Sequence, residues 1–368
     1  MNSENAKSKI KVLIVDDSAF MRTALSRMVA NDPDLLVVGS AASGNEALER
    51  IEPLDPDVIT LDVEMPGLNG LETLRCIMAR FPRPVIMVSS VTVKDADTTF
   101  SALEAGAFDY VPKQLASTSL DILHIREDLI AKIKAAAETR RSKQQIVLPR
   151  KPPRTAESTL KETAPHALAM GALGIVAIGI STGGPKALQE ILPTLPADFS
   201  VPILVVQHMP SGFTGPFAKR LDGLCAASVR EASQGETLQT GAVYIAPGGR
   251  QMTVDRSTDP RGTICLSDTP VNQLHIPSVD VMMQSVAAAY GPLAMGVIMT
   301  GMGSDGAEGM SAIQREGGFT LGQDESTCAV YGMPRVCAEM GILKRVVPLS
   351  RITYEILQAT RYRKVSVG

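Results

Sequence analysis

The chain has 368 residues, of which 45% are hydrophobic and 20% charged, and its formal net charge at pH 7 is −3. This length predicts two or three domains with sizeable cores, and the small net charge argues against nucleic acid or a membrane surface as a general partner. Five scattered cysteines without a Cys-x-x-Cys pair favour reduced thiols over a disulfide framework or a zinc site. The N-terminus is polar, and no apolar run reaches the ~18 residues of a membrane span, so we expect a cytoplasmic protein.

The first part of the chain, residues 9–135, alternates short apolar stretches with helical patterns. We expect strands at residues 11–15, 35–39, 57–61, 84–88 and 108–111. We expect one helix with an apolar pattern that begins at Phe20, and three more at residues 45–51, 70–81 and 95–105. Strands that alternate with helices predict an α/β domain, here a five-stranded parallel sheet with helices on both faces.

Polar residues stand where four of these strands end. They are Asp16 with Asp17, Asp62, Ser89 and Lys113. In a parallel sheet, ligands gather at the carboxyl ends of the strands. Three converging carboxylates repel one another unless a cation lies among them, and their hard oxygen atoms suit Mg²⁺. Such a site would also accept a phosphoryl group on Asp62, with Ser89 as hydroxyl donor and Lys113 as counter-charge.

Four segments of this domain resemble the receiver domain of two-component response regulators. They are Asp-Asp-Ser at 16–18, Leu-Asp-Val-Glu-Met-Pro at 61–66, Met-Val-Ser-Ser at 87–90 and Ala-Gly-Ala-Phe-Asp-Tyr-Val-Pro-Lys at 105–113. The resemblance implies a flavodoxin-like fold with Asp62 as the phosphoacceptor, and it implies these further roles: Asp16, Asp17 and Asp62 as metal ligands, Ser89 as the switch hydroxyl, Lys113 as the phosphate-pairing lysine. Gln114 follows the lysine, whereas many receivers have proline at this position. A cis peptide bond is usual before that proline, so we do not expect one here.

Residues 136–172 lose the periodic pattern and become rich in proline, serine, threonine and charge, which predicts a semi-flexible linker. No aromatic residues interleave with its basic side chains, so we interpret these as solvated charge and not as a nucleic-acid surface. His166 lies in this segment and receives no role.

The alternating pattern of residues 173–362 is too long for the helix-turn-helix module that ends many response regulators.

A glycine-rich turn opens this second domain. The apolar run 175–178 predicts a strand, the segment Gly-Ile-Ser-Thr-Gly follows at 179–183, and Pro185 begins a helix. The spacing Gly-x-Ser-x-Gly is typical of a nucleophile, here Ser181, raised on a tight turn between strand and helix. Glycine-rich turns before a helix also bind phosphate groups, so this stretch alone leaves both interpretations open.

Two later strand ends supply the partners that a nucleophile needs. His208 follows the expected strand 201–206, and Asp305 follows the expected strand 296–300. Because parallel strands of one sheet end at the same edge, these residues and Ser181 can meet there. We expect acyl-transfer chemistry, with His208 as general base, Asp305 as its orienting partner and backbone N–H groups around Met302 and the helix opening as donors to the oxyanion.

Each of these residues also has an ordinary structural interpretation. His208 is consistent with a histidine that merely ends a strand, and Asp305 with a cap for the helix that starts at Ala307. His275 is a rival base, although it follows no clear strand and precedes a helix. His124 lies in an apolar helical stretch of the first domain, where packing or surface exposure explains it.

Six segments of the second domain resemble the chemotaxis protein-glutamate methylesterase (CheB) family. They are Gly-Ile-Ser-Thr-Gly-Gly-Pro at 179–185, Val-Val-Gln-His-Met-Pro at 205–210, Ile-Ala-Pro-Gly-Gly-Arg at 245–250, Pro-Ser-Val-Asp at 277–280, Met-Thr-Gly-Met-Gly-Ser-Asp-Gly-Ala at 299–307 and Tyr-Gly-Met-Pro at 331–334. The resemblance implies a doubly wound, mainly parallel α/β esterase domain with these site residues: Ser181, His208 and Asp305 as the triad, Thr182 in support, and Met302 as an oxyanion N–H donor. Gln251 stands where the family often has histidine, which leaves the role of that position toward substrate open.

The resemblance also implies a function. We expect a serine esterase that hydrolyses glutamate methyl esters on chemoreceptors with release of methanol, and that also deamidates receptor glutamines. Phosphorylation of Asp62 by the chemotaxis histidine kinase, with Mg²⁺ bound, is expected to activate it, and the unphosphorylated receiver to cover the Ser181 cleft. The esterase itself is expected to need no cofactor, and the protein to be a monomer without nucleic-acid partner or membrane insertion.

Two other classes of function remain less consistent with the sequence. A nucleotide-binding oxidoreductase would use Gly-x-Gly-x-x-Gly, and Ser181 stands where the second glycine belongs. A purely regulatory protein without chemistry would not need serine, histidine and aspartate together at the strand ends.

Overall fold

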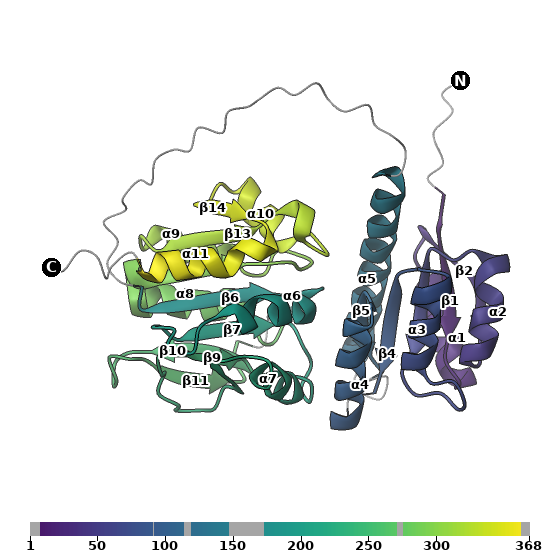
Figure 1. Ribbon diagram of the computed structural model, residues 1–368, viewed down its shortest axis with the longest axis horizontal. Helices are drawn as coiled ribbons and strands as arrows, with labels where there is room; N and C mark the ends of the chain where they lie inside the picture. Colours follow the sequence, from purple (N-terminus) through teal and green to yellow (C-terminus); the bar gives the residue numbers. More distant parts are fainter. Residues whose placement is uncertain (1–7, 91, 114–118, 147–172, 271–274, 362–368) are drawn as a thin grey trace, which may run out of the picture.

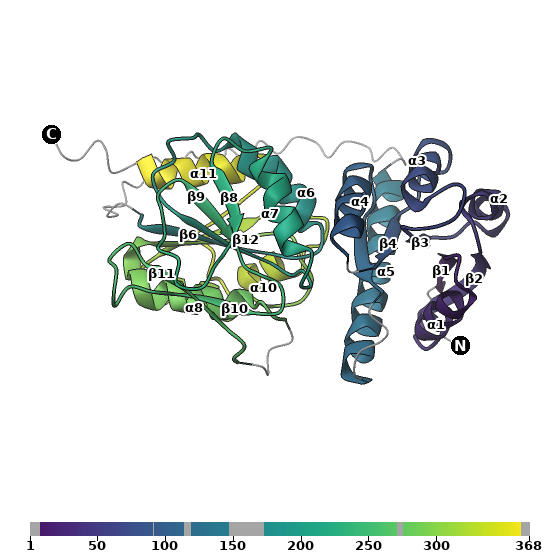
Figure 2. The ribbon, with the colours of Figure 1, turned by 90° about the horizontal axis from the view of Figure 1, so that it is seen from below.

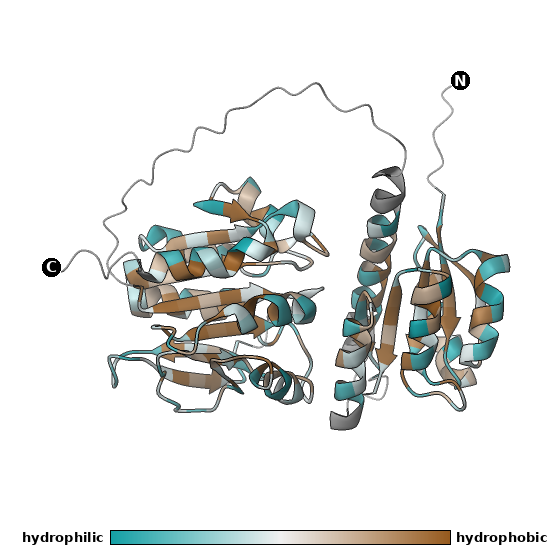
Figure 3. Cartoon of the chain, in the orientation of Figure 1, coloured by the Kyte–Doolittle hydropathy of each residue, from teal (hydrophilic) through white to brown (hydrophobic). Residues whose placement is uncertain are grey.

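The computed structural model describes residues 8–90, 92–113, 119–146, 173–270 and 275–361. Two α/β domains lie beside each other, and each is built on one parallel sheet (Figure 1). Apolar residues concentrate in the strands of both sheets, while the helices carry hydrophilic residues on their outer sides (Figure 3). Within the described ranges, no helix combines the length and the apolar character needed to cross a bilayer.

The N-terminal domain has the five-stranded parallel sheet that the sequence predicts. The strands run in the order β2-β1-β3-β4-β5, and every neighbouring pair is parallel. The strands are β1 Ile10–Val15, β2 Leu35–Ala41, β3 Val58–Asp62, β4 Val85–Ser89 and β5 Asp109–Pro112. The helices are α1 Ala19–Ala30, α2 Gly44–Leu54, α3 Gly70–Arg80, α4 Val93–Glu104 and α5 Ser119–Ile146.

Local sequence explains where these helices begin. Ser18 and Ser43 accept hydrogen bonds from backbone N–H groups in the first turns of α1 and α2, and Asn69 forms a capping box with Glu72 at α3. Such caps satisfy donors that have no partner inside the helix. Because α1 and α3 start directly after the loops that carry the polar strand ends, their caps help to hold those loops in place.

The last helix of this domain differs from the sequence-based expectation. The predicted linker begins at residue 136, but α5 continues to Ile146, so that boundary falls inside the helix. Ala136 and Ala137 are buried in the same apolar cluster as β1 and β4, and the segment that follows contains no proline or glycine before residue 149. Tertiary packing and good helix formers therefore extend the helix beyond the point where the apolar period fades.

The C-terminal domain is a seven-stranded, fully parallel sheet in the order β14-β13-β12-β6-β7-β9-β8, with a separate antiparallel hairpin β10-β11. The strands are β6 Ile175–Ile180, β7 Ile203–Gln207, β8 Ser228–Glu231, β9 Ala242–Ile245, β10 Gln251–Asp255, β11 Thr263–Ser267, β12 Ala294–Ile298, β13 Phe319–Gln323 and β14 Arg345–Val347. The α-helices are α6 Gly184–Ile191, α7 Thr214–Asp222, α8 Val279–Tyr290, α9 Ala307–Arg315, α10 Met333–Glu339 and α11 Leu349–Arg361, and short 3₁₀ helices cover Leu192–Thr194, Gly291–Leu293 and Glu325–Thr327.

Helices cover both faces of this sheet, as expected for a doubly wound fold. Apolar side chains of α6, α7 and α11 pack against one face, and those of α8, α9 and α10 pack against the other. The central strand β6 lies between β12 and β7, so three adjacent strands end together at the edge that faces the receiver domain (Figure 2).

The two domains meet through α4 on one side and α6 with α7 on the other. The ring of Phe100 from α4 is fully buried and lies 6.1 Å from the ring of Phe213 and 5.2 Å from that of Phe217. Tyr110 from β5 stacks on Phe213 with ring centroids 4.9 Å apart. This aromatic contact joins the apolar cores of the two domains into one cluster.

Candidate functional site

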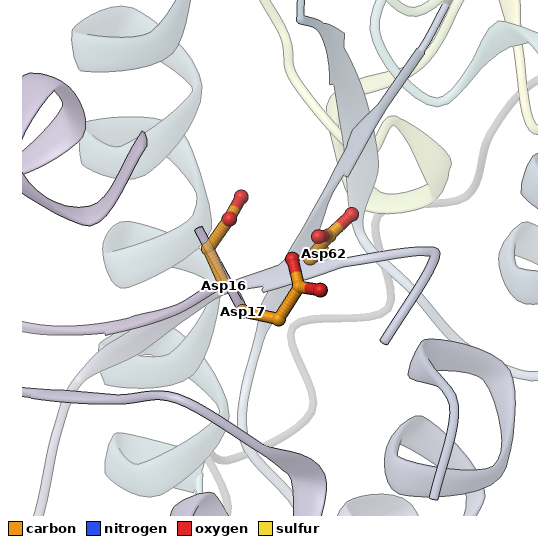
Figure 4. A group of neighbouring side chains, drawn as sticks. All are labelled: Asp16, Asp17 and Asp62. Atoms are coloured by element: carbon orange, nitrogen blue, oxygen red, sulfur yellow. The ribbon is translucent and has the colours of Figure 1, made fainter. Parts of the chain in front are cut away.

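The polar ends of the receiver strands form an acidic cluster of Asp16, Asp17 and Asp62 (Figure 4). Asp16 and Asp62 are buried and Asp17 is exposed, and their carboxylate oxygens lie within 4.8 Å of one another. The ammonium group of Lys113 is 3.0 Å from Oδ2 of Asp16 and 2.6 Å from Oδ2 of Asp62. The structure therefore brings together four of the five predicted receiver residues.

Burial and charge shift the titration of this cluster. Burial raises the pKa of Asp62 to about 6, and the charge of Asp16 adds to this effect while Lys113 opposes it. Burial opposes the charge on Lys113 itself, but the ion pairs with Asp62 and Asp16 outweigh it and raise its pKa. A cluster with three carboxylates and one ammonium group carries excess negative charge, so it can accept a divalent cation.

Ser89, the fifth predicted residue, ends β4 beside the strand that carries Asp62. Among the described residues, its hydroxyl bonds to the carbonyl of Ser90 at 3.2 Å and accepts a bond from Thr99 at 2.8 Å, and it does not bond to Asp62. Its role as a switch hydroxyl therefore stays a prediction. Gln114, on which the expected loss of the cis-peptide turn rests, lies outside the described residues, as does His166 of the linker.

Ser181 stands on the expected turn between strand β6 and helix α6. Its N–H donates to the carbonyl of Thr300 at 3.0 Å, and its own carbonyl accepts the N–H of Gly184 at 2.8 Å, which closes the turn. Gly183 has a φ of +76°, a conformation that favours glycine because it lacks a Cβ. Pro185 then occupies the first turn of α6, where its missing N–H leaves no bond unmade.

His208 and Asp305 meet at the ends of two strands that flank the Ser181 strand. His208 directly follows β7, and Asp305 lies in the loop between β12 and α9. Nε2 of His208 lies 2.7 Å from Oδ2 of Asp305, and both side chains are largely buried. The sequence-based expectation placed these two residues at one edge of the sheet, and the contact agrees with it.

Helix α8 holds Asp305 in place. The hydroxyl of Ser278 donates to Oδ1 at 2.8 Å, and the backbone N–H groups of Val279 and Asp280 donate to Oδ2 at 2.7 Å and Oδ1 at 2.9 Å. Burial by itself would raise the pKa of Asp305, but the bond with His208 and these N–H donors hold it well below its usual range. Asp305 is thus an anion at neutral pH and acts as more than a cap for its own helix.

The other ring nitrogen of His208, Nδ1, is buried and has no hydrogen-bond partner in the described part of the chain. Because the Nε2–H group donates a hydrogen bond to the Asp305 carboxylate, Nδ1 carries the lone pair in the neutral ring and is the basic atom. His275, the rival base, stacks on His208 with ring centroids 3.9 Å apart and an angle of 18° between the rings. His275 therefore supports the His208 ring from one face.

The loop after β12 brings Met302 to the same place. The carbonyl of Gly301 accepts two hydrogen bonds, from the N–H of Gly332 at 3.1 Å and of Met333 at 3.0 Å. Since a peptide unit is planar and trans, the N–H of Met302 points away from these donors. Met302 lines the cleft beside Ser181, so its N–H is available to a ligand there.

Residues of both domains line this cleft, which has a volume of about 450 Å³. The C-terminal domain contributes Ser181, Thr182, His208, Met209, Pro210, His275, Ile276, Pro277, Met302 and Gly303, and the N-terminal domain contributes Tyr110, Pro112, Glu127, Asp128, Ala131 and Lys132. No hydrogen bond joins the Ser181 hydroxyl to His208 in the described residues, and bonds of this kind often tighten only with substrate bound.

The sequence reasoning missed several of these contacts. Ser278 and Asp280 belong to the quoted segment Pro-Ser-Val-Asp, but nothing in their spacing indicates that their donors bind Asp305. Gln251 is fully buried, and its amide accepts from the N–H of Ser278 at 2.8 Å and donates to the carbonyl of Pro270 at 3.3 Å. It supports the loop that holds Asp305, which explains how a residue other than histidine is accommodated there.

Comparisons with known proteins agree with this two-part organisation. The family model of the CheB methylesterase matches residues 176–356, and that of the response regulator receiver domain matches residues 12–123. A protein-glutamate methylesterase/protein-glutamine glutaminase 1 from Oleidesulfovibrio alaskensis is 47% identical over 95% of this chain and 99% of its own length. A protein-glutamate methylesterase/protein-glutamine glutaminase from Pyrococcus horikoshii is 44% identical over 95% and 94%.

Solved structures from Thermotoga maritima are similar to the two halves. The CheB methylesterase catalytic domain is 38% identical, with a TM-score of 0.49 over 51% of this chain and 99% of that chain. The CheB response regulator domain is 48% identical, with a TM-score of 0.33 over 35% of this chain and 97% of that chain. From the matched family models and the full-length relatives it follows that this chain belongs to the CheB family of protein-glutamate methylesterases, with a response regulator receiver domain before the methylesterase domain.

Proposed function

We propose that this chain hydrolyses glutamate methyl esters on methyl-accepting chemoreceptors with Ser181 as nucleophile, His208 as general base and Asp305 as its orienting partner. The observation that carries the proposal is the 2.7 Å contact between His208 and Asp305 in the cleft that Ser181 also lines. A phosphate-binding turn would have no use for a buried histidine paired with a carboxylate.

The first half of the reaction transfers the glutamyl group to the enzyme. Ser181 Oγ attacks the ester carbonyl while Nδ1 of His208 takes its proton, and Asp305 stabilises the imidazolium that forms. The negative charge on the carbonyl oxygen is held by the backbone N–H groups of Thr182 and Met302. When the tetrahedral intermediate collapses, the imidazolium gives its proton to the leaving methoxide, and methanol departs.

The second half returns the enzyme to its starting state. A water molecule loses a proton to His208 and attacks the acyl ester on Ser181, and the same N–H groups hold the second oxyanion. Collapse releases the glutamate side chain and restores the Ser181 hydroxyl. A glutamine side chain follows the same path with ammonia as the leaving group, which explains the deamidation that the names of the relatives imply.

Replacement of the nucleophile tests this assignment. Ser181→Ala should abolish methanol release from a methylated receptor fragment and labelling by a fluorophosphonate probe. Ser233→Ala, the same change at an exposed position, should leave both unchanged. Methanol release that persists in Ser181→Ala would contradict the serine mechanism.

We further propose that the receiver is phosphorylated on Asp62 with Mg²⁺ bound by Asp16, Asp17 and Asp62. The donor set fits the metal, because three carboxylates lie within 4.8 Å and oxygen ligands of this kind suit Mg²⁺. When bound, the metal neutralises charge on the incoming phosphoryl group. Lys113 pairs with Asp62 and is placed to pair with the phosphoryl group, and Ser89 can donate to it only after leaving Ser90.

The arrangement of the domains suggests how phosphorylation controls the esterase. Tyr110 and Pro112 of β5, together with Lys132 of α5, line the cleft of Ser181. We propose that these residues keep a receptor helix from the serine while the domains are in contact. A change at Asp62 that moves β5 or α4 would loosen this contact. The expected phosphodonor is the histidine kinase of the pathway. Asp62→Asn should therefore lose the increase in methanol release that a phosphodonor produces in the parent protein.

A further inference from the structure

A buried glutamine links the backbone of the nucleophile to that of the base. Gln207 is the last residue of β7, pairs in register with Ile180 of β6, and is 2% exposed. Its Nε2 donates to the carbonyl of Ser181 at 3.0 Å and to the carbonyl of His208 at 3.1 Å. One amide therefore joins the two strand ends from which the catalytic serine and histidine project.

The orientation of this amide is determined by its partners. Both acceptors are carbonyl oxygens, so the nitrogen must face them, and a rotated amide would place oxygen against oxygen. The remaining atom, Oε1, is buried without a hydrogen-bond partner in the described residues. It lies against Gly184 at the start of α6, where an added Cβ would collide with it. A buried polar atom without a partner costs free energy, and in a native structure it calls for a functional explanation.

The bond to Ser181 determines the direction of the next N–H group. The Ser181 carbonyl accepts from Gln207 at 3.0 Å and from the N–H of Gly184 at 2.8 Å, so the peptide unit is held by two donors. Because this unit is planar and trans, the N–H of Thr182 points the opposite way. This N–H has no acceptor among the described residues, and Thr182 lines the cleft.

The loop of Met302 is held in the same manner. Its preceding carbonyl, that of Gly301, is also held by two N–H donors, at 3.1 and 3.0 Å. Two peptide units close to Ser181 thus each have a carbonyl held by two donors and an N–H group left for a ligand. In the Met302 unit both donors are backbone groups, whereas in the Thr182 unit one of the two is a side chain and can be changed by mutation.

We propose that Gln207 is a positioning residue that holds the Ser181–Thr182 peptide so that the N–H of Thr182 serves as an oxyanion donor. This inference rests on the proposed roles of Ser181 and His208. Gln207 is not among the residues that line the cleft, so its effect passes through the backbone. Loss of its donors should therefore weaken binding of the transition state and leave binding of the ester largely unchanged.

The experiment compares Gln207→Met and Gln207→Asn in the full chain. Met has a similar length and no donor, while Asn keeps an amide that is one methylene too short to reach both carbonyls. Each variant is assayed for methanol release from a peptide with a glutamate methyl ester, with acetyl phosphate as phosphodonor. Removal of a whole oxyanion donor costs roughly 10²–10³ in rate, so a misdirected donor should lower kcat roughly 10-fold to 100-fold in Gln207→Met, with KM within about twofold. Gln207→Asn should lose more than about threefold in kcat, but less than Gln207→Met.

A matched control separates this role from lost stability. The buried hydroxyl of Thr320 donates to the carbonyl of Ile342 and accepts from the N–H of Lys344, outside the cleft. Thr320→Val should lower Tm as the Gln207 variants do, with kcat unchanged. The proposal is overturned if kcat of a folded Gln207 variant stays within about threefold of the parent, or if the loss lies in KM. Gln207→Asn, the milder change, provides this test should Gln207→Met not fold.

The same assay distinguishes this failure from failure of the proposed function. If the parent releases no methanol, or if Ser181→Ala still releases it, the serine mechanism itself is wrong. If the parent is active, Ser181→Ala is inactive and the Gln207 variants keep their kcat, only the positioning role is wrong.

Discussion

Truncation of Phe100 should release the catalytic domain from the receiver without phosphorylation. The Phe100 ring is fully buried and contacts the rings of Phe213 and Phe217 across the domain boundary at 6.1 and 5.2 Å. Each aromatic pair contributes about 0.5–1.5 kcal/mol beyond the area it buries, so two pairs supply about 1–3 kcal/mol of attraction between the domains. Loss of this attraction in Phe100→Ala raises the ratio of open to closed molecules roughly 5-fold to 150-fold.

The assay is methanol release by the full chain without phosphodonor, and the expected result is a rise of that order, limited by the activity of the fully open enzyme. Phe81→Ala, in the receiver but outside these aromatic contacts, is the control for loss of receiver stability. Glu104→Ala removes the exposed ion pair with Arg220 at the same interface and should change activity little. If folded Phe100→Ala keeps the low activity of the unphosphorylated parent, the aromatic contact does not hold the domains together.

Three further outcomes follow from the site. Asp305→Asn should keep KM and lower kcat for methanol release by about 10⁴, because His208 loses its anionic partner, and a loss below tenfold would contradict the triad. Burial raises the pKa of Asp62 to about 6, so Asp62 is protonated at pH 5 and ionised at pH 7.5. Mg²⁺ must displace a proton at the lower pH, so it should raise Tm more at pH 7.5, and an equal rise at both would contradict displacement of a proton from Asp62. Gly183→Ala, at a φ of +76° and with its new Cβ 2.5 Å from Ala329, should lower stability by about 1–2 kcal/mol or more by thermal unfolding.

The sequence by itself determined the two sheets and the ends of their functional strands. Short apolar runs that alternate with helical periods are local signals, and in a parallel sheet every strand ends at the same edge. The polar residues directly after such runs, Asp62 and His208 among them, could therefore be assigned to one edge of a sheet without coordinates. The resemblance to known families then selected Ser181 as a nucleophile where the glycine-rich turn left a phosphate site open.

Other features depend on contacts between segments far apart in the chain. The donors to Asp305 come from the start of α8, about 25 residues before it, and no period in the sequence relates the two. The end of α5 at Ile146 reflects burial of Ala136 and Ala137 in the receiver core, which composition alone does not indicate. Packing between distant segments therefore decides where such a helix ends and which groups donate hydrogen bonds to a site residue such as Asp305.

The relation between the two domains is the clearest case. In the sequence, Phe100 and Phe213 each look like an ordinary core residue of their own domain. The pattern of apolar residues does not show whether such a side chain is buried within one domain or between two domains. Only the tertiary structure places Tyr110 and Lys132 of the receiver beside Ser181. The chemistry of the esterase could thus be inferred from residues near strand ends, whereas its control rests on a surface that exists only when both domains are folded and in contact.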